Sequence, residues 1–176
     1  MTQCYVFAFC RVVVGLVFLA AFVGKIRNIP RFQQTITNFQ LLPGRLNGPM
    51  AFLFIGVELA VLICIAIGHR LLLPGFLLAL VLLLLFSLAL ASVLFRKLRT
   101  SCDCFGSDEK PVSPADIWRN AGFLCCALGG CGTLIRLPDI ETSLTGLEWL
   151  LVGMAAGMFV LVWTQLGEIA RLFRSL

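Results

Sequence analysis

The sequence predicts an all-α bundle of membrane-spanning helices, and three observations carry that prediction. First, 60% of the 176 residues are hydrophobic and 13% are charged, whereas soluble domains average about 45–50% apolar and about 25% charged residues. Second, the mean hydropathy of +0.99 is too high for a surface that faces water. Third, five apolar runs approach the length of about 17–25 residues that a helix needs to cross a bilayer. We therefore expect one multi-pass membrane domain over residues 1–176.

The first predicted span covers residues 5–23 and contains the ionisable Arg11. No basic residue precedes this run and no Ala-x-Ala pattern follows it, so we interpret it as a membrane anchor and not as a cleaved signal peptide. The next segment alternates polar residues with apolar ones at the spacing of one helical face: Phe32, Ile36 and Phe39. This pattern predicts an amphipathic helix along the membrane surface, from near Pro30 to residues 43–44, either as a plain connection or as a binding element.

Four further predicted spans follow, over residues 50–67, 71–95, 117–134 and 147–166. The third of these is marginal, because it begins with polar residues and contains four glycines. Gly122, Cys126 and Gly130 recur in it at every fourth position. Such a stripe of small residues lets neighbouring helices approach closely, so we expect a central, tightly packed helix there.

The basic residues outside the spans are unevenly distributed between the two predicted sides of the membrane. Ten lie on one side: Lys25, Arg27, Arg31, Arg45, Arg96, Lys97, Arg99, Lys110, Arg171 and Arg174. Only Arg70 and Arg136 lie on the other. Because cytoplasmic loops are enriched in Lys and Arg, we expect an inner-membrane protein with its N-terminus outside and its C-terminus inside. The net charge of +5 therefore indicates orientation in the lipid bilayer and not affinity for nucleic acid.

Residues 99–120 interrupt the apolar pattern and hold Cys102 and Cys104, which this orientation places in the cytoplasm. A disulfide between residues two apart closes a very small ring, and such strain makes a disulfide a stronger oxidant. Arg99 would lower the pKa of a nearby thiol, whereas Asp103 between the cysteines opposes that shift. The pair therefore predicts a redox-active dithiol, half of a metal site, or two loop thiols without a special role.

Arg11 and Glu58 are ionisable residues within predicted spans. Such groups are costly in a membrane and usually pair in the bundle interior. Counting about 1.5 Å per residue from the outer ends places Arg11 about 10 Å deep and Glu58 about 15 Å deep. We therefore predict a membrane-embedded polar pair of Arg11 and Glu58, with Lys25 as the rival partner. The pair would fix the helix register, or would serve a quinone headgroup or proton transfer.

Arg119 and Asn120 begin the 117–134 span beside the two cysteines. Arg119 fits an interfacial anchor that extends towards lipid phosphates, or a cation that stabilises a Cys102 or Cys104 thiolate. Cys102, Cys104 and Arg119 are thus the candidate catalytic residues. The single His69 argues against a histidine-rich metal site.

Three segments together resemble one known family: G-K-I-R-N-I-P-R-F-Q-Q-T-I-T-N-F-Q-L-L-P at residues 24–43, the span with Glu58, and S-C-D-C-F-G with S-P-A-D-I-W-R-N at residues 101–106 and 113–120. Their order and spacing resemble the methylamine utilisation protein MauE family, which belongs to the DoxX-like membrane proteins. The matching residues are Lys25, Phe32, Pro43, Glu58, Cys102, Cys104, Phe105, Gly106, Arg119 and Asn120. The family's loop usually reads C-G-C-F-G, and here Asp103 replaces the glycine.

This resemblance implies a four-helix DoxX-like core with an added C-terminal span, in a redox-associated membrane protein. The family's namesake is implicated in maturing the disulfide-rich small subunit of methylamine dehydrogenase alongside a thioredoxin-like partner. We therefore expect thiol–disulfide exchange or electron transfer during maturation of a partner enzyme. Two alternatives belong to other classes: a non-catalytic membrane scaffold for an oxidoreductase such as a thioredoxin-like protein, and a small-solute transporter.

Overall fold

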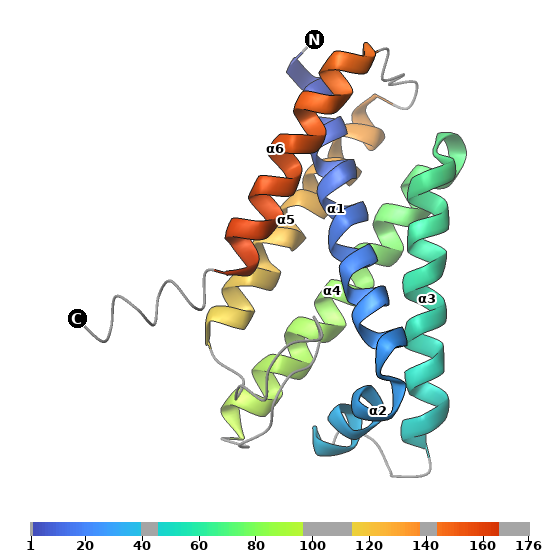
Figure 1. The fold of residues 1–176 in the computed structure, drawn as a ribbon, viewed down its shortest axis with the longest axis vertical. Helices are drawn as coiled ribbons and strands as arrows, with labels where there is room; N and C mark the ends of the chain where they lie inside the picture. Colours follow the sequence, from blue (N-terminus) through green and yellow to red (C-terminus); the bar gives the residue numbers. More distant parts are fainter. Residues whose placement is uncertain (1, 40–45, 97–113, 138–143, 166–176) are drawn as a thin grey trace, which may run out of the picture.

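A computed structural model describes residues 2–39, 46–96, 114–137 and 144–165 of the chain (Figure 1). The described residues form six α-helices: α1 (Thr2–Arg27), α2 (Ile29–Asn38), α3 (Asn47–Ile67), α4 (Leu72–Phe95), α5 (Pro114–Arg136) and α6 (Gly146–Thr164). A single 3₁₀ turn, η2 (His69–Leu71), leads into α4. The predicted all-α class is therefore confirmed for the part of the chain that the structure describes.

Four helical segments are long and apolar enough to cross a membrane: Thr2–Arg27, Asn47–Ile67, His69–Phe95 and Gly146–Thr164. They contain the first three predicted spans and residues 147–164 of the fifth, so the multi-pass architecture is confirmed. The remaining predicted span, residues 117–134, lies in α5, which is not among the four. Its polar first turns, with Trp118, Arg119 and Asn120, lower its mean hydropathy.

The long helices run up and down beside one another, with α1 in the middle (Figure 1). α1 packs against α3, α5 and α6, and α4 packs against both α3 and α5. At one end of the bundle, hereafter the α2 end, lie the C-terminus of α1, the short α2, the start of α3 and the end of α4, and α5 begins somewhat above this end (Figure 1). The start of α1, the turn η2 and the start of α6 lie at the opposite, N-terminal end.

The predicted small-residue stripe on α5 is confirmed as a packing surface. A Cβ added to Gly122 would collide with the indole of Trp163 on α6. A Cβ added to Gly130 would collide with the ring of Phe76 on α4, and Cys126 between the two glycines is buried. α5 is therefore held close to both neighbours because its backbone has no side chains at these contacts.

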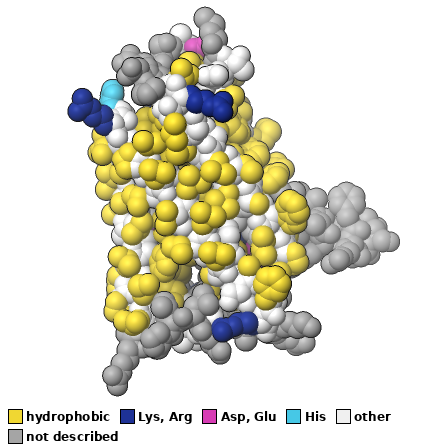
Figure 2. All heavy atoms as spheres, turned by 180° about the vertical axis from the view of Figure 1, so that it is seen from behind, with side chains coloured by type: hydrophobic (Ala, Val, Ile, Leu, Met, Phe, Trp, Pro, Cys, Tyr) yellow, Lys and Arg dark blue, Asp and Glu magenta, His cyan; other side chains and the backbone are white. Residues whose placement is uncertain are grey.

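The amphipathic helix expected after the first span is present as α2, which buries Phe32 against the bundle. It begins at Ile29, and residues 43–44, where its end was predicted, lie outside the described residues. On the face seen in Figure 2, hydrophobic side chains cover the middle of the molecule, and Lys and Arg side chains lie towards its two ends. This distribution is what a bilayer requires, with an apolar band between two charged boundaries.

Candidate functional site

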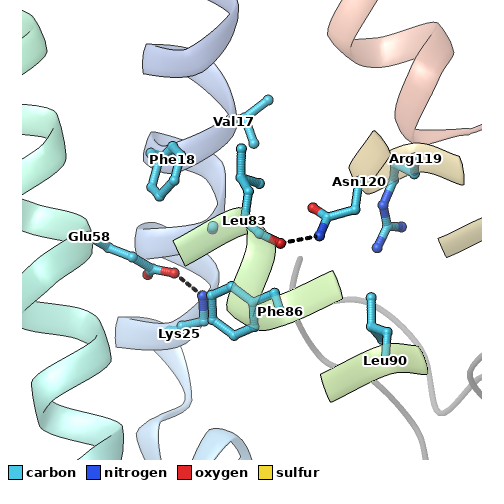
Figure 3. A pocket seen from close by; sticks show the side chains of 10 residues that line it. Val17, Phe18, Lys25, Glu58, Leu83, Phe86, Leu90, Arg119 and Asn120 are labelled. Atoms are coloured by element: carbon cyan, nitrogen blue, oxygen red, sulfur yellow. Dashed lines mark hydrogen bonds and ion pairs between the residues drawn. The ribbon is translucent and has the colours of Figure 1, made fainter. Parts of the chain in front are cut away.

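The most deeply buried polar contact of the described residues is an ion pair between two helices. The Nζ of Lys25, in the last turn of α1, donates a hydrogen bond to Oε1 of Glu58, in the middle of α3 (Figure 3). Each side chain is only 1% exposed. Two charges at this depth are tolerated because each compensates the other, and removing one of them would leave the other without compensation.

Two aromatic rings complete the surroundings of the ammonium group. The Nζ of Lys25 lies 5.1 Å from the ring centroid of Phe32 on α2 and 4.8 Å from that of Phe86 on α4. Both distances fall within the range of about 6 Å over which a cation is attracted to the face of an aromatic ring. Phe86 in turn lies 5.4 Å from Phe54 of α3, centroid to centroid. The Lys25 charge is therefore enclosed by groups from three helices.

The carboxylate of Glu58 is only half satisfied. Its Oε2 is buried and has no hydrogen-bond partner among the described residues. Beside it lies a pocket of about 40 Å³, lined by Val17, Phe18, Ala21, Lys25, Glu58, Leu83, Phe86, Leu90, Arg119 and Asn120. A cavity needs about 10–15 Å³ of such space to hold a water molecule, so this pocket has room for water beside Glu58. Oε2 can accept a hydrogen bond or a proton from a group that enters the pocket.

The far wall of the pocket is the start of α5. Asn120 donates from Nδ2 to the carbonyl oxygen of Leu83, at 3.0 Å, and to Oγ of Ser87, at 2.7 Å. Arg119 forms an ion pair with Asp116 one turn earlier, at 3.2 Å. These contacts hold the polar start of α5 against α4, so that Arg119 and Asn120 line the same pocket as the buried ion pair.

The start of α5 is also attached to α6. The indole nitrogen of Trp163 donates to the carbonyl oxygen of Arg119 at 3.0 Å. Trp163 stacks on Phe159 with ring centroids 5.3 Å apart. The backbone at Arg119 is therefore fixed from two sides, which gives the pocket a rigid wall.

The predicted pairing of Arg11 with Glu58 is wrong. Arg11 donates from Nε and Nη2 to the carbonyl oxygen of Ile65, at 3.1 and 2.8 Å, and from Nη2 to that of Ala66, at 3.3 Å. Side chains on a helix lean towards its N-terminus, and α1 and α3 are antiparallel. Arg11 and Glu58 therefore lean away from each other, whereas Lys25 and Glu58 lean together.

The structure thus brings Glu58, Arg119 and Asn120 to one pocket and adds Lys25, which the sequence offered only as a rival partner. Cys102 and Cys104, the predicted exchanging thiols, lie outside the described residues. Sequence reasoning missed the role of Phe86. Nothing in the leucine-rich run, which also contains Phe76 and Phe95, marks Phe86 out, because its contact with Lys25 depends on helix packing.

Comparisons with known proteins identify the family of this chain. The family model described as "Methylamine utilisation protein MauE" matches residues 3–133. A methylamine utilization protein MauE of Paracoccus denitrificans is 32% identical over 163 residues, covering 91% of this chain and 86% of that protein. Its counterpart from Methylophilus methylotrophus is 30% identical over 152 residues, covering 86% of this chain and 78% of that protein. No solved structure matches the chain significantly. With three quarters of its length matched by the family model, the chain belongs to the methylamine utilisation protein MauE family.

Proposed function

We propose that this chain is an inner-membrane component of thiol–disulfide exchange or electron transfer that assists the maturation of a partner enzyme. The relatives are named for methylamine utilisation, which makes a methylamine dehydrogenase the candidate client. One observation carries the proposal: Arg119 and Asn120, which follow the Cys102 and Cys104 segment in sequence, line the pocket of the buried Lys25–Glu58 pair. The residues that follow the candidate dithiol in sequence thus line a pocket with a buried carboxylate that can accept a proton.

In this proposal Cys102 and Cys104 are the exchanging thiols. Two client thiols reduce the Cys102–Cys104 disulfide, so that the client gains a disulfide and this chain gains a dithiol. Re-oxidation of the dithiol releases two electrons and two protons to a membrane quinone or a thioredoxin-like partner. Arg119 stabilises a thiolate in competition with its Asp116 partner, and Oε2 of Glu58 is available to accept a proton.

We further propose that α5 is a fifth span and that the N-terminus is outside. α5 runs antiparallel to α4 along the bundle. Gly122 and Gly130 each lie so close to a neighbouring helix that an added Cβ would collide with it, so α5 is packed along its length. The orientation follows from the ten basic residues on one predicted side and two on the other. A membrane-impermeant thiol reagent should label Cys102 and Cys104 only after the cells are permeabilised. Labelling in intact cells would reverse the orientation.

The central test is substitution of the two cysteines. Cys102→Ser and Cys104→Ser should each abolish client maturation, measured as disulfide formation in the client, while the amount of protein in the membrane stays unchanged. Cys125→Ser is the matched control, because Cys125 is an exposed free thiol on α5, and it should leave maturation intact.

The same variants separate the alternatives. A scaffold would tolerate the Cys102→Ser, Cys104→Ser double variant and would still support client maturation. A metal half-site would bring stoichiometric zinc with the purified protein, and a chelator would reproduce the effect of the serines. Full maturation with the double variant ends the thiol-exchange proposal.

A further inference from the structure

A second polar position lies towards the N-terminal end of the bundle, well separated from the Lys25–Glu58 pair. An apolar groove of about 520 Å³ runs there between α1, α3 and the start of α6. Its lining consists of Arg11, Val12, Gly15, Leu16, Leu19, Leu62, Ile65, Ala66 and Trp149. Arg11 is the one charged residue in this lining. The volume falls within the range of about 300–1,000 Å³ that is usual for small-molecule sites.

Arg11 is held in place but is not saturated. Its Nε and Nη2 donate to the last carbonyl oxygens of α3, on Ile65 and Ala66, which a helix leaves without partners in its own backbone. Its Nη1 makes no hydrogen bond to any described residue. The guanidinium is thus fixed in orientation by α3 and keeps one nitrogen for a ligand.

The guanidinium lies where α3 ends and the chain turns towards α4. It lies against Gly68, where a Cβ would come within 3.1 Å of Nη2. Gly68 ends α3 and is followed by the exposed His69 and Arg70. Trp149 also lines the groove, and tryptophan is enriched where the hydrocarbon of a bilayer meets its headgroups.

The acidic residue that the structure describes beside the groove is already engaged. Among the described residues, the acid next to Trp149 is Glu148, which accepts hydrogen bonds from the hydroxyl of Tyr5 and from the amide and hydroxyl of Thr145. An anionic group is therefore favoured beside the open nitrogen of Arg11.

We propose that this groove is a binding site for an anionic phospholipid. One acyl chain lies along the apolar wall of α1 and α3, and the phosphate accepts hydrogen bonds from Nη1 of Arg11. Arginine suits this role because its planar guanidinium donates to phosphate oxygens in a fixed geometry and is weakly hydrated. The site is independent of the proposed thiol chemistry, and it would attach the α1–α3–α6 side of the bundle to one leaflet.

The test uses the purified full chain, stripped of lipid, with native mass spectrometry as the measure of bound lipid. Phosphatidylglycerol should bind in a ratio of one to one, and more tightly than phosphatidylcholine with the same acyl chains. Arg11→Gln should weaken phosphatidylglycerol binding at least about tenfold, which corresponds to about 1.4 kcal/mol. Arg70→Gln is the matched control, because Arg70 is an exposed cation at the same end but outside the groove, and it should have little effect.

A second variant keeps the test decisive if Arg11→Gln fails to fold. The Cβ of residue 15 would make only an ordinary contact, 3.7 Å from Ile65, so Gly15→Leu fills the groove while Arg11 stays in place. It should reduce the binding of both lipids. Equal binding of the two lipids by the native chain would overturn the proposal, as would equal losses in Arg11→Gln and Arg70→Gln. A dimer without bound lipid in the mass spectrum would also overturn it, because the groove would then be covered by a second copy of the chain.

Discussion

α1 carries two cations within the bundle, and the structure compensates them in different ways. Lys25 is buried to 1% exposure and is compensated by a carboxylate and two aromatic rings. Arg11 is partly buried and is compensated by the backbone carbonyl oxygens at the end of α3. A compact ammonium in the interior needs a full opposite charge, whereas a guanidinium near the boundary can use dipoles and keep contact with polar surroundings.

The two arrangements also leave opposite groups open. At Lys25 the open group is an acceptor, Oε2 of Glu58, a residue that lines a pocket of about 40 Å³. At Arg11 the open group is a donor, Nη1, at the end of a much larger apolar groove. The first site therefore suits a water molecule or a proton, and the second suits an anion that carries a long apolar chain. The predictions below test whether the two cations are as unlike as this comparison implies.

The largest effect is expected from removing the carboxylate. Glu58→Leu leaves the Lys25 ammonium buried and unpaired, which should lower the free energy of unfolding by about 3–5 kcal/mol. Adding Lys25→Met should restore most of this loss, because two apolar side chains of similar size can replace a buried ion pair. The measurement is reversible unfolding of the purified variants in detergent micelles.

Arg11 supplies the control for this prediction. Combining Glu58→Leu with Arg11→Leu should give about the sum of the two separate losses, because the two side chains lean apart. Restoration of stability by Arg11→Leu instead of Lys25→Met would mean that the ion pair has been assigned to the wrong partner.

The Lys25–Glu58 ion pair shows which features the sequence could predict and which it could not. The four apolar spans were predictable because long runs of Leu, Val, Ile and Phe have few other solutions than a membrane helix. That Glu58 must have a cationic partner was also predictable. Its identity was not, because the choice between Arg11 and Lys25 depends on the direction in which side chains lean from antiparallel helices.

α5 illustrates the same limit from another side. Its small-residue stripe was predicted from spacing alone and is confirmed by the contacts at Gly122 and Gly130. The bonds from Asn120 to Leu83 and Ser87 were not predictable, because they join two helices whose relative rotation the sequence pattern does not fix. The pocket could therefore not be predicted from the sequence, because it depends on how α4 packs against α5.

A smaller effect is expected at the other cation. Arg11→Gln removes the charge-assisted hydrogen bonds to Ile65 and Ala66, but its amide can still donate to one of these carbonyl oxygens. We expect a loss of about 1–2 kcal/mol in the free energy of unfolding, since hydrogen bonds to charged groups contribute about 1.5–3 kcal/mol. The same micelle unfolding measurement applies, and Arg70→Gln on the surface should change stability by no more than about 0.5 kcal/mol. A loss as large as that of Glu58→Leu would make the two cations equivalent and refute the comparison.

The smallest effect is expected from the aromatic rings around Lys25. Phe86→Leu removes a ring face that lies 4.8 Å from the ammonium, and it also removes the ring contact with Phe54. Only the first loss depends on the charge of Lys25. Measuring Phe86→Leu in the native chain and in the Lys25→Met, Glu58→Leu background should therefore isolate a coupling of about 0.5–1 kcal/mol, within the range of cation–π contacts.

Phe7→Leu provides the reference for that coupling. Phe7 is buried and lies 6.0 Å from Phe76, centroid to centroid, in the half of α1 away from Lys25. Phe7→Leu should lower the free energy of unfolding by the same amount in both backgrounds, because the effects of distant sites without shared partners add within about 0.3–0.5 kcal/mol. If Phe86→Leu were equally insensitive to the background, the ring would act as apolar packing alone. The charge of Lys25 would then be stabilised by Glu58 and Phe32 alone. The two cations would differ mainly in their acceptor, which is a carboxylate for Lys25 and backbone carbonyl oxygens for Arg11.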